Sequence, residues 1–305
     1  MKKNLFVNNS NFKSMKMTFI IIFLAISTFA FSQTNDYFTE IENWRNNRIE
    51  RLKSENGWLN LAGLFWLKEG DNTFGKNSKN DIKFETENTA DFLGKMVVKG
   101  DEIWFYSNET SAVYHGEEMV KSVKIYPYEN NPVVLKHNNL RWFIIKRGDK
   151  YAIRLRDLEG KFLKEFTGID YFPIDPKMKI EAKFIPIPGK KLFITDATGR
   201  TYESDSPGKV LFTINGQEVS LEPTGTLQQL SFVFADETTN DETYGGGRFL
   251  DTKGPDANNV VILDFNKAYN PPCVFTPFAT CPLPTKENKL KVAIRAGEKD
   301  SGNHP

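Results

Sequence analysis

The sequence predicts a mostly β protein, built from antiparallel sheets in a sandwich or barrel-like arrangement, with one amphipathic helix near the N-terminus. Two observations carry this prediction. Short apolar runs of alternating character are separated by glycine-containing turns, and a single segment has apolar residues at helical spacing. The composition agrees, because 25 Phe, 10 Tyr and 5 Trp supply flat rings that pack well on pleated surfaces.

The helix is predicted over residues 36–56. Side chains suited to one face of a helix recur at intervals of three or four residues. They are Phe38, Ile41, Trp44, Arg48 and Leu52. Asp36 is a suitable residue to cap the start, and Asn56-Gly57 is typical of a helix end.

Three pairs of short runs are predicted to form hairpins. Their turns are Lys99-Gly100-Asp101, Gly148-Asp149 and Asn215-Gly216. In the strand after the second turn, side chains alternate between the two faces. Arg154 and Arg156 therefore share one face, and the apolar Tyr151, Ile153 and Leu155 share the other.

Residues 1–32 are typical of a cleavable signal peptide. Lys13 and Lys16 precede the apolar run Thr18–Phe31, whose fourteen residues are fewer than the roughly 20 that span a bilayer. Cleavage after Ser32 would start the mature chain at Gln33. We therefore expect a periplasmic or secreted protein with no membrane span after cleavage, and an uncleaved N-terminal anchor is the alternative.

Residues 33–305 are predicted to form a single β-rich domain, whose last buried strands are Val260–Phe265 and Val292–Ile294. Two lobes are the alternative, divided near residues 127–139, where Pro132 and polar residues interrupt the pattern of strands.

The charge of the mature chain is nearly balanced. The whole sequence has 40 basic and 39 acidic residues, and four of its lysines lie within residues 1–32. Without them, 36 basic and 39 acidic residues remain. A balanced charge gives no electrostatic footprint for nucleic acid, so no nucleic-acid partner is expected.

The C-terminal third contains motifs that can be compared with a known family. They are residues 244–250 (YGGGRFL), 264–273 (DFNKAYNPPC), 281–284 (CPLP), 287–288 (EN) and 296–299 (AGEK). The sequence resembles the bacterial family called domain of unknown function 1684. Gly57–Leu59 with Ala62–Leu64, and Arg154–Asp157, fit the same pattern, so the resemblance covers nearly all of the mature chain. The family name assigns no activity, so the resemblance implies no reaction.

No motif of high catalytic specificity is present. Gly245–Gly247 lacks the Gly-Lys-Ser/Thr of a phosphate loop and is expected to form a turn or bulge; close approach of its backbone to a ligand is the alternative. His115, His137 and His304 are far apart, without the spacing of metal ligands. No Gly-x-Ser-x-Gly nucleophile elbow occurs. Neither a metal nor a cofactor is expected.

The two cysteines, Cys273 and Cys281, enclose seven residues. In an exported chain a disulfide is the leading interpretation. Two buried free thiols and a reactive thiol are the alternatives, although neither cysteine has a nearby basic cluster.

Two groups of residues are candidates for ligand binding. The first comprises Arg248, Asp264, Asn266, Asn270 and Glu298. A charge at the end of an apolar strand is costly unless it is paired or serves a ligand, and the structural interpretation is that Arg248 and Asp264 neutralise each other. The second group is Arg154 and Arg156, which form either a solvated strand face or a fork for a carboxylate ligand.

These observations leave three functions open, and they do not identify catalytic residues. The first is an exported protein that binds a small polar or anionic molecule. The second is a carboxylate-dependent hydrolytic enzyme that uses Asp264 or Glu298 near Arg248. The third is a structural or partner-binding envelope protein. Convergence of the candidate residues in one concave site would favour the first two.

Overall fold

A computed structural model of the protein describes residues 36–300, except residue 88, together with residues 302 and 304. The predicted signal peptide, residues 1–32, lies outside the described residues. The chain divides into two compact units, with the boundary between Asn47 and Arg48. The described part of the first unit is helical, and the sheets all belong to the second.

The predicted N-terminal helix is confirmed, over residues 36–53. It ends three residues earlier than predicted because the carbonyl of Ser54 accepts hydrogen bonds other than the helical one from the N–H four residues later. This oxygen accepts the N–H of Gly57 at 2.7 Å and the side-chain amide of Asn60 at 2.6 Å. These tighter bonds satisfy the end of the helix, and a 3-10 helix, Trp58–Asn60, follows.

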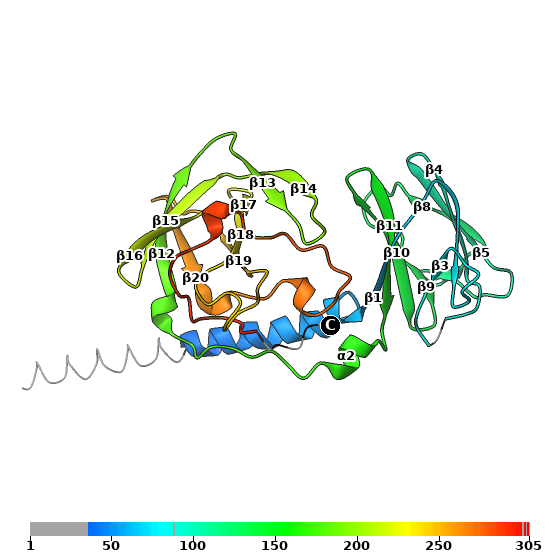
Figure 1. Cartoon of the computed structure of the whole chain (residues 1–305), viewed down its shortest axis with the longest axis horizontal. Coiled ribbons are helices and arrows are strands. Elements are labelled where there is room, and N and C mark those ends of the chain that lie inside the picture. The colour runs from blue at the N-terminus through cyan, green and yellow to red at the C-terminus, as the bar shows by residue number, and fades with distance from the viewer. Residues whose placement is uncertain (1–35, 88, 301, 303, 305) are drawn as a thin grey trace, which may run out of the picture. The chain divides into compact units, whose positions relative to one another are not determined.

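Two sheets pack together in the first part of the second unit (Figure 1). One has six strands, in the order β1 (Leu61–Trp66), β11 (Lys150–Asp157), β10 (Leu140–Arg147), β9 (Leu135–His137), β6 (Tyr114–His115) and β7 (Glu118–Met119). The other has five, in the order β3 (Ile82–Lys83), β2 (Gly70–Gly75), β4 (Gly94–Lys99), β5 (Glu102–Ser107) and β8 (Ser122–Tyr126). Strands β2 and β3 pair in parallel, and the other pairs in these two sheets are antiparallel.

The core between these sheets contains Trp142 of β10, which is fully buried. Its ring meets three phenylalanine rings nearly edge-on. The centroids of Phe74, Phe84 and Phe105 lie 5.8, 6.3 and 6.1 Å away. Aromatic pairs in this geometry stabilise a core beyond the effect of buried area. We call this the Trp142 core.

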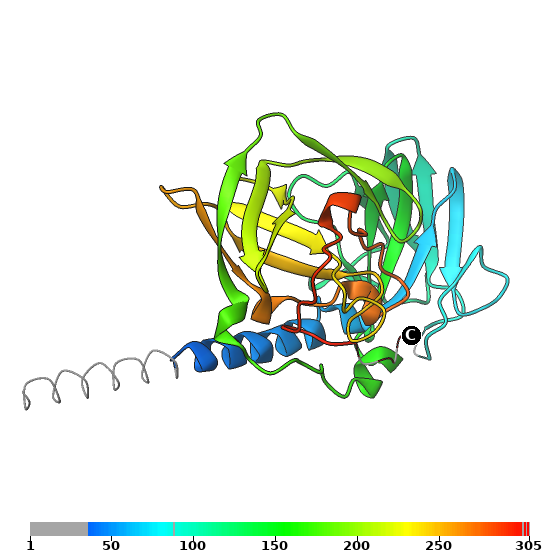
Figure 2. The ribbon, with the colours of Figure 1, turned by 60° about the vertical axis from the view of Figure 1, so that its left-hand side comes forward.

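The remaining strands form three further antiparallel sheets. One has the order β16 (Gln217–Leu221), β15 (Gly208–Ile214), β12 (Lys179–Pro186) and β20 (Val260–Asp264). A second has the order β17 (Thr224–Gly225), β18 (Gln229–Phe234) and β19 (Arg248–Lys253), and β13 (Lys191–Thr195) pairs with β14 (Thr201–Asp205). The first two of these sheets share one apolar core, and Figure 2 shows their strands around it.

The predicted hairpins are confirmed. Turns at residues 100–101, 148–149 and 215–216 join β4 to β5, β10 to β11 and β15 to β16. Asn215 and Gly216 both have positive φ, 50° and 78°. This backbone conformation matches the twist of the flanking strands in a two-residue hairpin.

The predicted strand at Val292–Ile294 is wrong. Val292 and Ile294 are buried, but their backbone is irregular. Ile294 bonds to side chains instead of a neighbouring strand. Its carbonyl accepts Arg248 Nη2 at 2.8 Å, and its N–H donates to Asp236 Oδ1 at 3.3 Å. Apolar character therefore predicted the burial of this segment but not its backbone geometry.

The predicted fold class is confirmed. The described chain is mostly β, with several antiparallel sheets, none of them closed, and one N-terminal helix. The remaining short helices are α2 (Lys161–Glu165) and the 3-10 helices Pro176–Met178, Phe265–Lys267, Pro272–Val274 and Lys286–Asn288. Because β1 pairs directly with β11, the six-stranded sheet contains strands from both sides of residues 127–139. The division into lobes near those residues stays a prediction.

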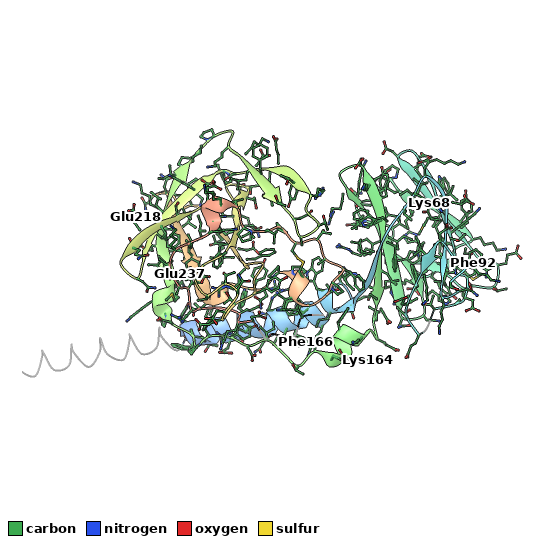
Figure 3. All side chains as sticks on the ribbon, viewed as in Figure 1. Lys68, Phe92, Lys164, Phe166, Glu218 and Glu237 are labelled. Carbon is green, nitrogen blue, oxygen red and sulfur yellow. A yellow bond between two sulfur atoms is a disulfide. The ribbon has the colours of Figure 1, made fainter. Side chains whose placement is uncertain are left out.

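A third apolar cluster lies beside α2. It joins Leu52, Leu59 and Phe275 with partly buried side chains that include Phe166, which is labelled in Figure 3. Residues Leu59, Phe166 and Phe275 also line a cavity of about 440 Å³.

We expect Trp142→Ala to lower the free energy of unfolding by about 3–5 kcal/mol, because it removes a fully buried indole and leaves a cavity. The matched control is Phe193→Ala. Phe193 is 67% exposed, so its loss should change the stability by less than about 0.5 kcal/mol. Urea unfolding followed by circular dichroism measures both, and equal effects would contradict the central place of Trp142.

Candidate functional site

The five polar residues of the C-terminal candidate group are all buried. Arg248 begins β19, Asp264 ends β20, and Asn266 lies in the 3-10 helix that follows. Asn270 and Glu298 lie in irregular segments. No more than 7% of any of the five is exposed. The structure places them in three groups of contacts, and the first two are joined, because Arg248 Nη1 also donates to the carbonyl of Glu298 at 3.4 Å.

Arg248 pairs with Asp236, and not with Asp264 as the structural interpretation of the sequence proposed. Its Nη2 donates to Asp236 Oδ2 at 2.7 Å and to the carbonyl of Ile294 at 2.8 Å. Its Nη1 donates to the carbonyl of Ala296. Burial lowers the pKa of Arg248, and the charge of Asp236 opposes that shift. The arginine therefore links an ion pair to the backbone of the C-terminal segment.

Sequence reasoning missed Asp236. This residue follows β18 by two positions, and its side chain is fully buried. Its Oδ1 accepts the N–H and the hydroxyl of Thr238 at 2.8 and 2.6 Å. An aspartate with a threonine two positions later, directly after an apolar strand, indicates such a turn. Nothing in that local signal identifies Arg248 as the partner.

Glu298 forms the second group, with Arg48 from the N-terminal helix. Arg48 Nε donates to Glu298 Oε1 at 3.0 Å, and Arg48 Nη2 donates to the carbonyl of Asn270 at 2.8 Å. The N–H of Asn270 donates to Glu298 Oε2 at 2.7 Å. Burial raises the pKa of Glu298, and the charge of Arg48 opposes this. The guanidinium carbon of Arg48 also lies 4.7 Å from the ring centroid of Tyr269.

Asp264 and Asn266 form the third group. Asp264 Oδ1 accepts the N–H of Asn266 at 3.2 Å, at the start of the 3-10 helix, and Asp264 Oδ2 lies 3.8 Å from Lys267 Nζ. The side-chain amide of Asn266 bonds to both the N–H and the carbonyl of Asp175, at 3.0 and 2.8 Å. These contacts stabilise two chain segments against each other.

The contacts of all three groups are structural. Three cavities in the described part of the chain, of about 440, 340 and 480 Å³, are lined by none of the five candidates. The five residues therefore do not converge in any of these cavities.

The glycine run Gly245–Gly247 forms a turn, which agrees with the structural interpretation. Gly247 has a φ of 82°, and its N–H donates to the carbonyl of Tyr244 at 3.0 Å. A Cβ at Gly247 would lie 2.5 Å from the carbonyl oxygen of Phe234. Both the backbone angle and the close packing therefore require glycine here.

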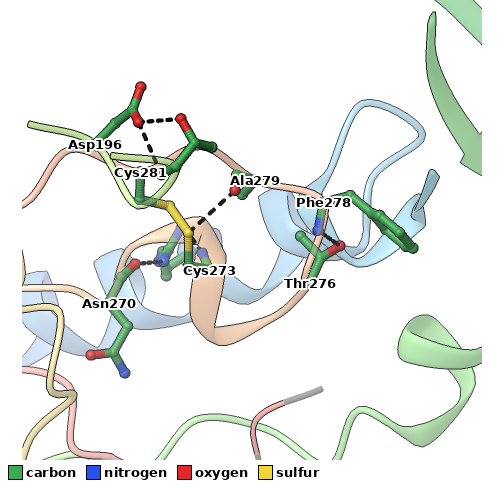
Figure 4. Close-up of a disulfide and its surroundings, with 9 residues drawn as sticks. Asp196, Asn270, Cys273, Thr276, Phe278, Ala279 and Cys281 are labelled. Atoms are coloured by element: carbon green, nitrogen blue, oxygen red, sulfur yellow. Dashed lines mark hydrogen bonds between the residues drawn. A yellow bond between two sulfur atoms is a disulfide. The ribbon is translucent and has the colours of Figure 1, made fainter. Parts of the chain in front are cut away.

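Cys273 and Cys281 are joined by a disulfide, with their Cα atoms 6.3 Å apart (Figure 4). Within the closed loop, the N–H of Phe278 donates to the hydroxyl of Thr276 at 3.3 Å. The carbonyl of Cys281 accepts the N–H of Ala197 at 2.8 Å. A loop this short gives a disulfide about 2–3 kcal/mol of stabilisation at most, so the bridge fixes a local turn and does not hold the whole fold.

The second candidate pair, Arg154 and Arg156, lies on β11. Tyr151, Ile153 and Leu155 belong to the Trp142 core, which confirms the predicted alternation of faces. The two arginines lie on the opposite face of the strand. Leu64 of β1 and Phe143 of β10 are the residues directly opposite Arg154.

Arg154 does not lie on a solvated strand face. It is only 6% exposed, and its Nε is buried with no hydrogen-bond partner. Its guanidinium carbon lies 5.6 Å from the ring centroid of Trp58. Within the described part of the chain, no hydrogen bond or ion pair to the side chain of Arg154 is found. Its two Nη atoms are not among the buried unpartnered atoms, so they keep contact with solvent.

Arg156 is half-buried and approaches the same region. Its Nη1 donates to the carbonyls of Gly57 and Glu55 at 3.0 and 3.3 Å, and its Nε is buried without a partner. Its guanidinium carbon lies 5.6 Å from the ring centroid of Phe143. Sequence reasoning missed Glu55 and Trp58, because they are far from β11 in the chain.

The electrostatics distinguish Arg154 from Arg248. Burial, together with the nearby charges of Arg147 and Arg156, lowers the pKa of Arg154 to about 10. Burial also lowers the pKa of Arg156, opposed by the charge of Glu55. Arg154 therefore remains a cation at neutral pH, without the opposite charge that Arg248 finds in Asp236. A buried cation in this position can bind an anion.

The described residues contain no group of three or more His, Cys, Asp or Glu side chains placed to hold a metal ion. His137 Nδ1 lies 2.9 Å from the carbonyl oxygen of Ala112, and His304 Nε2 lies 2.9 Å from Asp300 Oδ1. His115 ends β6 beside Gly116, a turn residue with a φ of 61°.

None of the described helices has both the length and the apolar character needed to cross a membrane.

Comparison with known families gives a match over residues 164–299 to the family described as "Protein of unknown function (DUF1684)". This confirms the resemblance of the C-terminal motifs to that family. Arg154 and Arg156 lie outside the matched residues. No match is found among curated proteins.

Two solved structures show weak similarity. The solution NMR structure of an uncharacterized protein of Haloarcula marismortui is 27% identical and has a TM-score of 0.39, covering 46% of this chain and 80% of that one. The crystal structure of the FhaA FHA domain complexed with the intracellular domain of Rv3910 is 14% identical, with a TM-score of 0.19, covering 30% and 97%. Both scores are too low to define the fold.

For the buried ion pair, we expect Asp236→Asn to lower the free energy of unfolding by about 3–5 kcal/mol, because it leaves the charge of Arg248 buried without compensation. Arg295→Gln is the matched control. Arg295 pairs with Glu242 and its side chain is 61% exposed, so its loss should cost about 1 kcal/mol or less. Guanidinium unfolding of both variants measures the difference, and a small effect of Asp236→Asn would show that the pair does not stabilise the fold.

Proposed function

We propose that this protein binds a small anionic molecule on the outer face of β11, at Arg154 and Arg156. One observation supports the proposal most strongly. Arg154 has 94% of its residue surface buried, yet its guanidinium has no hydrogen bond or ion pair in the described chain. The other deeply buried arginines have such partners: Arg248 has Asp236 and two carbonyls, and Arg48 has Glu298 and the carbonyl of Asn270.

Physical chemistry supports a ligand at this position. Transfer of a charge from water into a protein is expensive unless it is paired, and the pairs that suit a guanidinium best are carboxylates and phosphates bound by two parallel N–H groups. The two accessible Nη atoms of Arg154 form such a fork. The guanidinium carbon lies 5.6 Å from the ring centroid of Trp58, and this contact limits the freedom of the side chain before a ligand binds.

The hydrolytic alternative has weaker support. One of its two candidate carboxylates, Glu298, is fully buried, and both of its oxygens accept hydrogen bonds, from Arg48 and from Asn270. A general acid or base must reach the proton it transfers. A carboxylate with both oxygens occupied inside the protein is poorly placed for that role.

We also propose that the protein is exported. The apolar run Thr18–Phe31 and the small residues Ala30 and Ser32 support it. We expect the protein recovered from its native host to begin within two residues of Gln33, and intact-mass analysis tests this. A cytoplasmic product that keeps residues 17–32 would contradict export.

For the binding site, we expect Arg154→Gln to weaken anion binding by about tenfold to a hundredfold, because a charge-assisted hydrogen bond is lost. The free energy of unfolding without ligand should stay unchanged or rise by about 1 kcal/mol, because the variant no longer buries an unpaired charge. Titration calorimetry with benzoate, phenyl sulfate and phenyl phosphate measures affinity, and urea unfolding measures stability.

Arg295→Gln is again the control, and should change neither quantity by much. The proposal fails if none of the three anions binds the wild-type protein in a manner that depends on Arg154. It also fails if Arg154→Gln destabilises the protein by several kcal/mol, since that would indicate a structural role.

A further inference from the structure

We infer that the anion carries two negative charges on one tetrahedral group, as a phosphate monoester does, and that Arg154 and Arg156 bind this group together. The inference rests on the proposed function and names its ligand class. It is carried by the convergence of two arginines on one strand face and by the excess of positive charge around them.

The geometry brings the two guanidinium groups toward each other. Residues two positions apart on a strand lie on the same face, about 6.5–7 Å apart along the chain. Phe143 is directly opposite Arg154 in the register, and the guanidinium carbon of Arg156 lies 5.6 Å from the Phe143 ring centroid. The side chain of Arg156 is therefore directed along the strand toward Arg154.

A second pair of contacts points to the same place. Arg156 Nη1 donates to the carbonyl of Gly57 at 3.0 Å, and Arg154 lies against the ring of the next residue, Trp58. The two guanidinium groups thus contact consecutive residues of the chain, Arg156 at Gly57 and Arg154 at Trp58. One group with several oxygens can accept from the free N–H groups of both.

The charges that face this position are mostly positive. From β10 come Arg141, which is paired with Arg156 in the register, and Arg147; β11 adds Lys150 at its start. Glu55 is the acidic residue that contacts this group, and its carboxylate accepts Arg141 Nε at 2.8 Å.

Tyr202 of β14 interacts electrostatically with Arg147, and Arg200, just before β14, is ion-paired with Asp196. On β1, Leu64 opposes Arg154 and Trp66 opposes Ala152. A single negative charge therefore leaves most of the positive charge uncompensated. A dianion neutralises both Arg154 and Arg156.

Three phenyl compounds separate charge from shape. Phenyl phosphate is a tetrahedral dianion above the second pKa of a phosphate monoester, which is about 6. Phenyl sulfate is tetrahedral but a monoanion, and benzoate is a planar monoanion. At pH 8 we expect titration calorimetry on the full mature chain to show phenyl phosphate binding about tenfold or more tightly than either monoanion.

The pH dependence is the second measurement. Between pH 8 and pH 5 phenyl phosphate becomes mostly a monoanion, so its advantage over phenyl sulfate should disappear. Phenyl sulfate keeps its charge over this range and reports any change in the protein itself. The quenching of Trp58 fluorescence, checked against a Trp58→Phe variant, provides an independent readout.

Variants at Arg156 complete the test. Arg156→Gln should reduce the preference for phenyl phosphate over phenyl sulfate severalfold, and Arg295→Gln should leave it unchanged. If Arg156→Gln does not fold, Arg156→Lys keeps the charge but loses the fork, so it should retain the preference with weaker affinity for both.

The possible failures are distinguishable. Equal or tighter binding of phenyl sulfate or benzoate, with dependence on Arg154, would overturn the dianion inference and leave the anion-binding function standing. Absence of Arg154-dependent binding for all three compounds would overturn both.

Discussion

The buried ion pair between Arg248 and Asp236 is the constraint on which the C-terminal part of this structure depends. The segment after residue 289 contains buried apolar side chains but no strand within the described residues, so its backbone groups need partners from elsewhere. Arg248 donates to the carbonyls of Ile294 and Ala296, and Asp236 accepts the N–H of Ile294. The charged pair thus supplies the backbone hydrogen bonds that a neighbouring strand supplies in a sheet. Removing one partner would leave both a buried charge and unpaired backbone groups.

A second ion pair extends the same principle. Arg48 and Glu298 are 250 residues apart in the sequence, and they connect the end of the N-terminal helix to the C-terminal segment through Asn270. The polar residues in the C-terminal motifs therefore bond to one another and to the backbone. In the sequence, such a cluster of polar residues suggests a ligand site. In the structure, these side chains instead supply the hydrogen bonds that an irregular backbone segment needs.

Arg154 is a buried arginine whose side chain has no such partners. It has the same chemistry as Arg248 and comparable burial, with 6% against 1% exposure. The difference lies in the surrounding charges, which are negative around Arg248 and positive around Arg154. Stability alone would favour an apolar residue at such a position. The presence of a cation there is the reason to seek its counterpart outside the chain, in a ligand.

The sequence by itself determined the local features of this protein. The helix and the hairpin at Asn215-Gly216 depend on residues within a few positions of one another, and alternation along β11 correctly separated Arg154 from Ile153. Only the tertiary structure decided that Arg248 pairs with Asp236 and not with Asp264, and that Trp58 covers Arg154. Trp58 and Arg154 are distant in the chain, and Arg248 has several carboxylates near it in the sequence. No local pattern shows which of these residues the fold brings into contact. For the same reason the sequence could propose the candidate residues, but could not say which of their charges would be left unpaired.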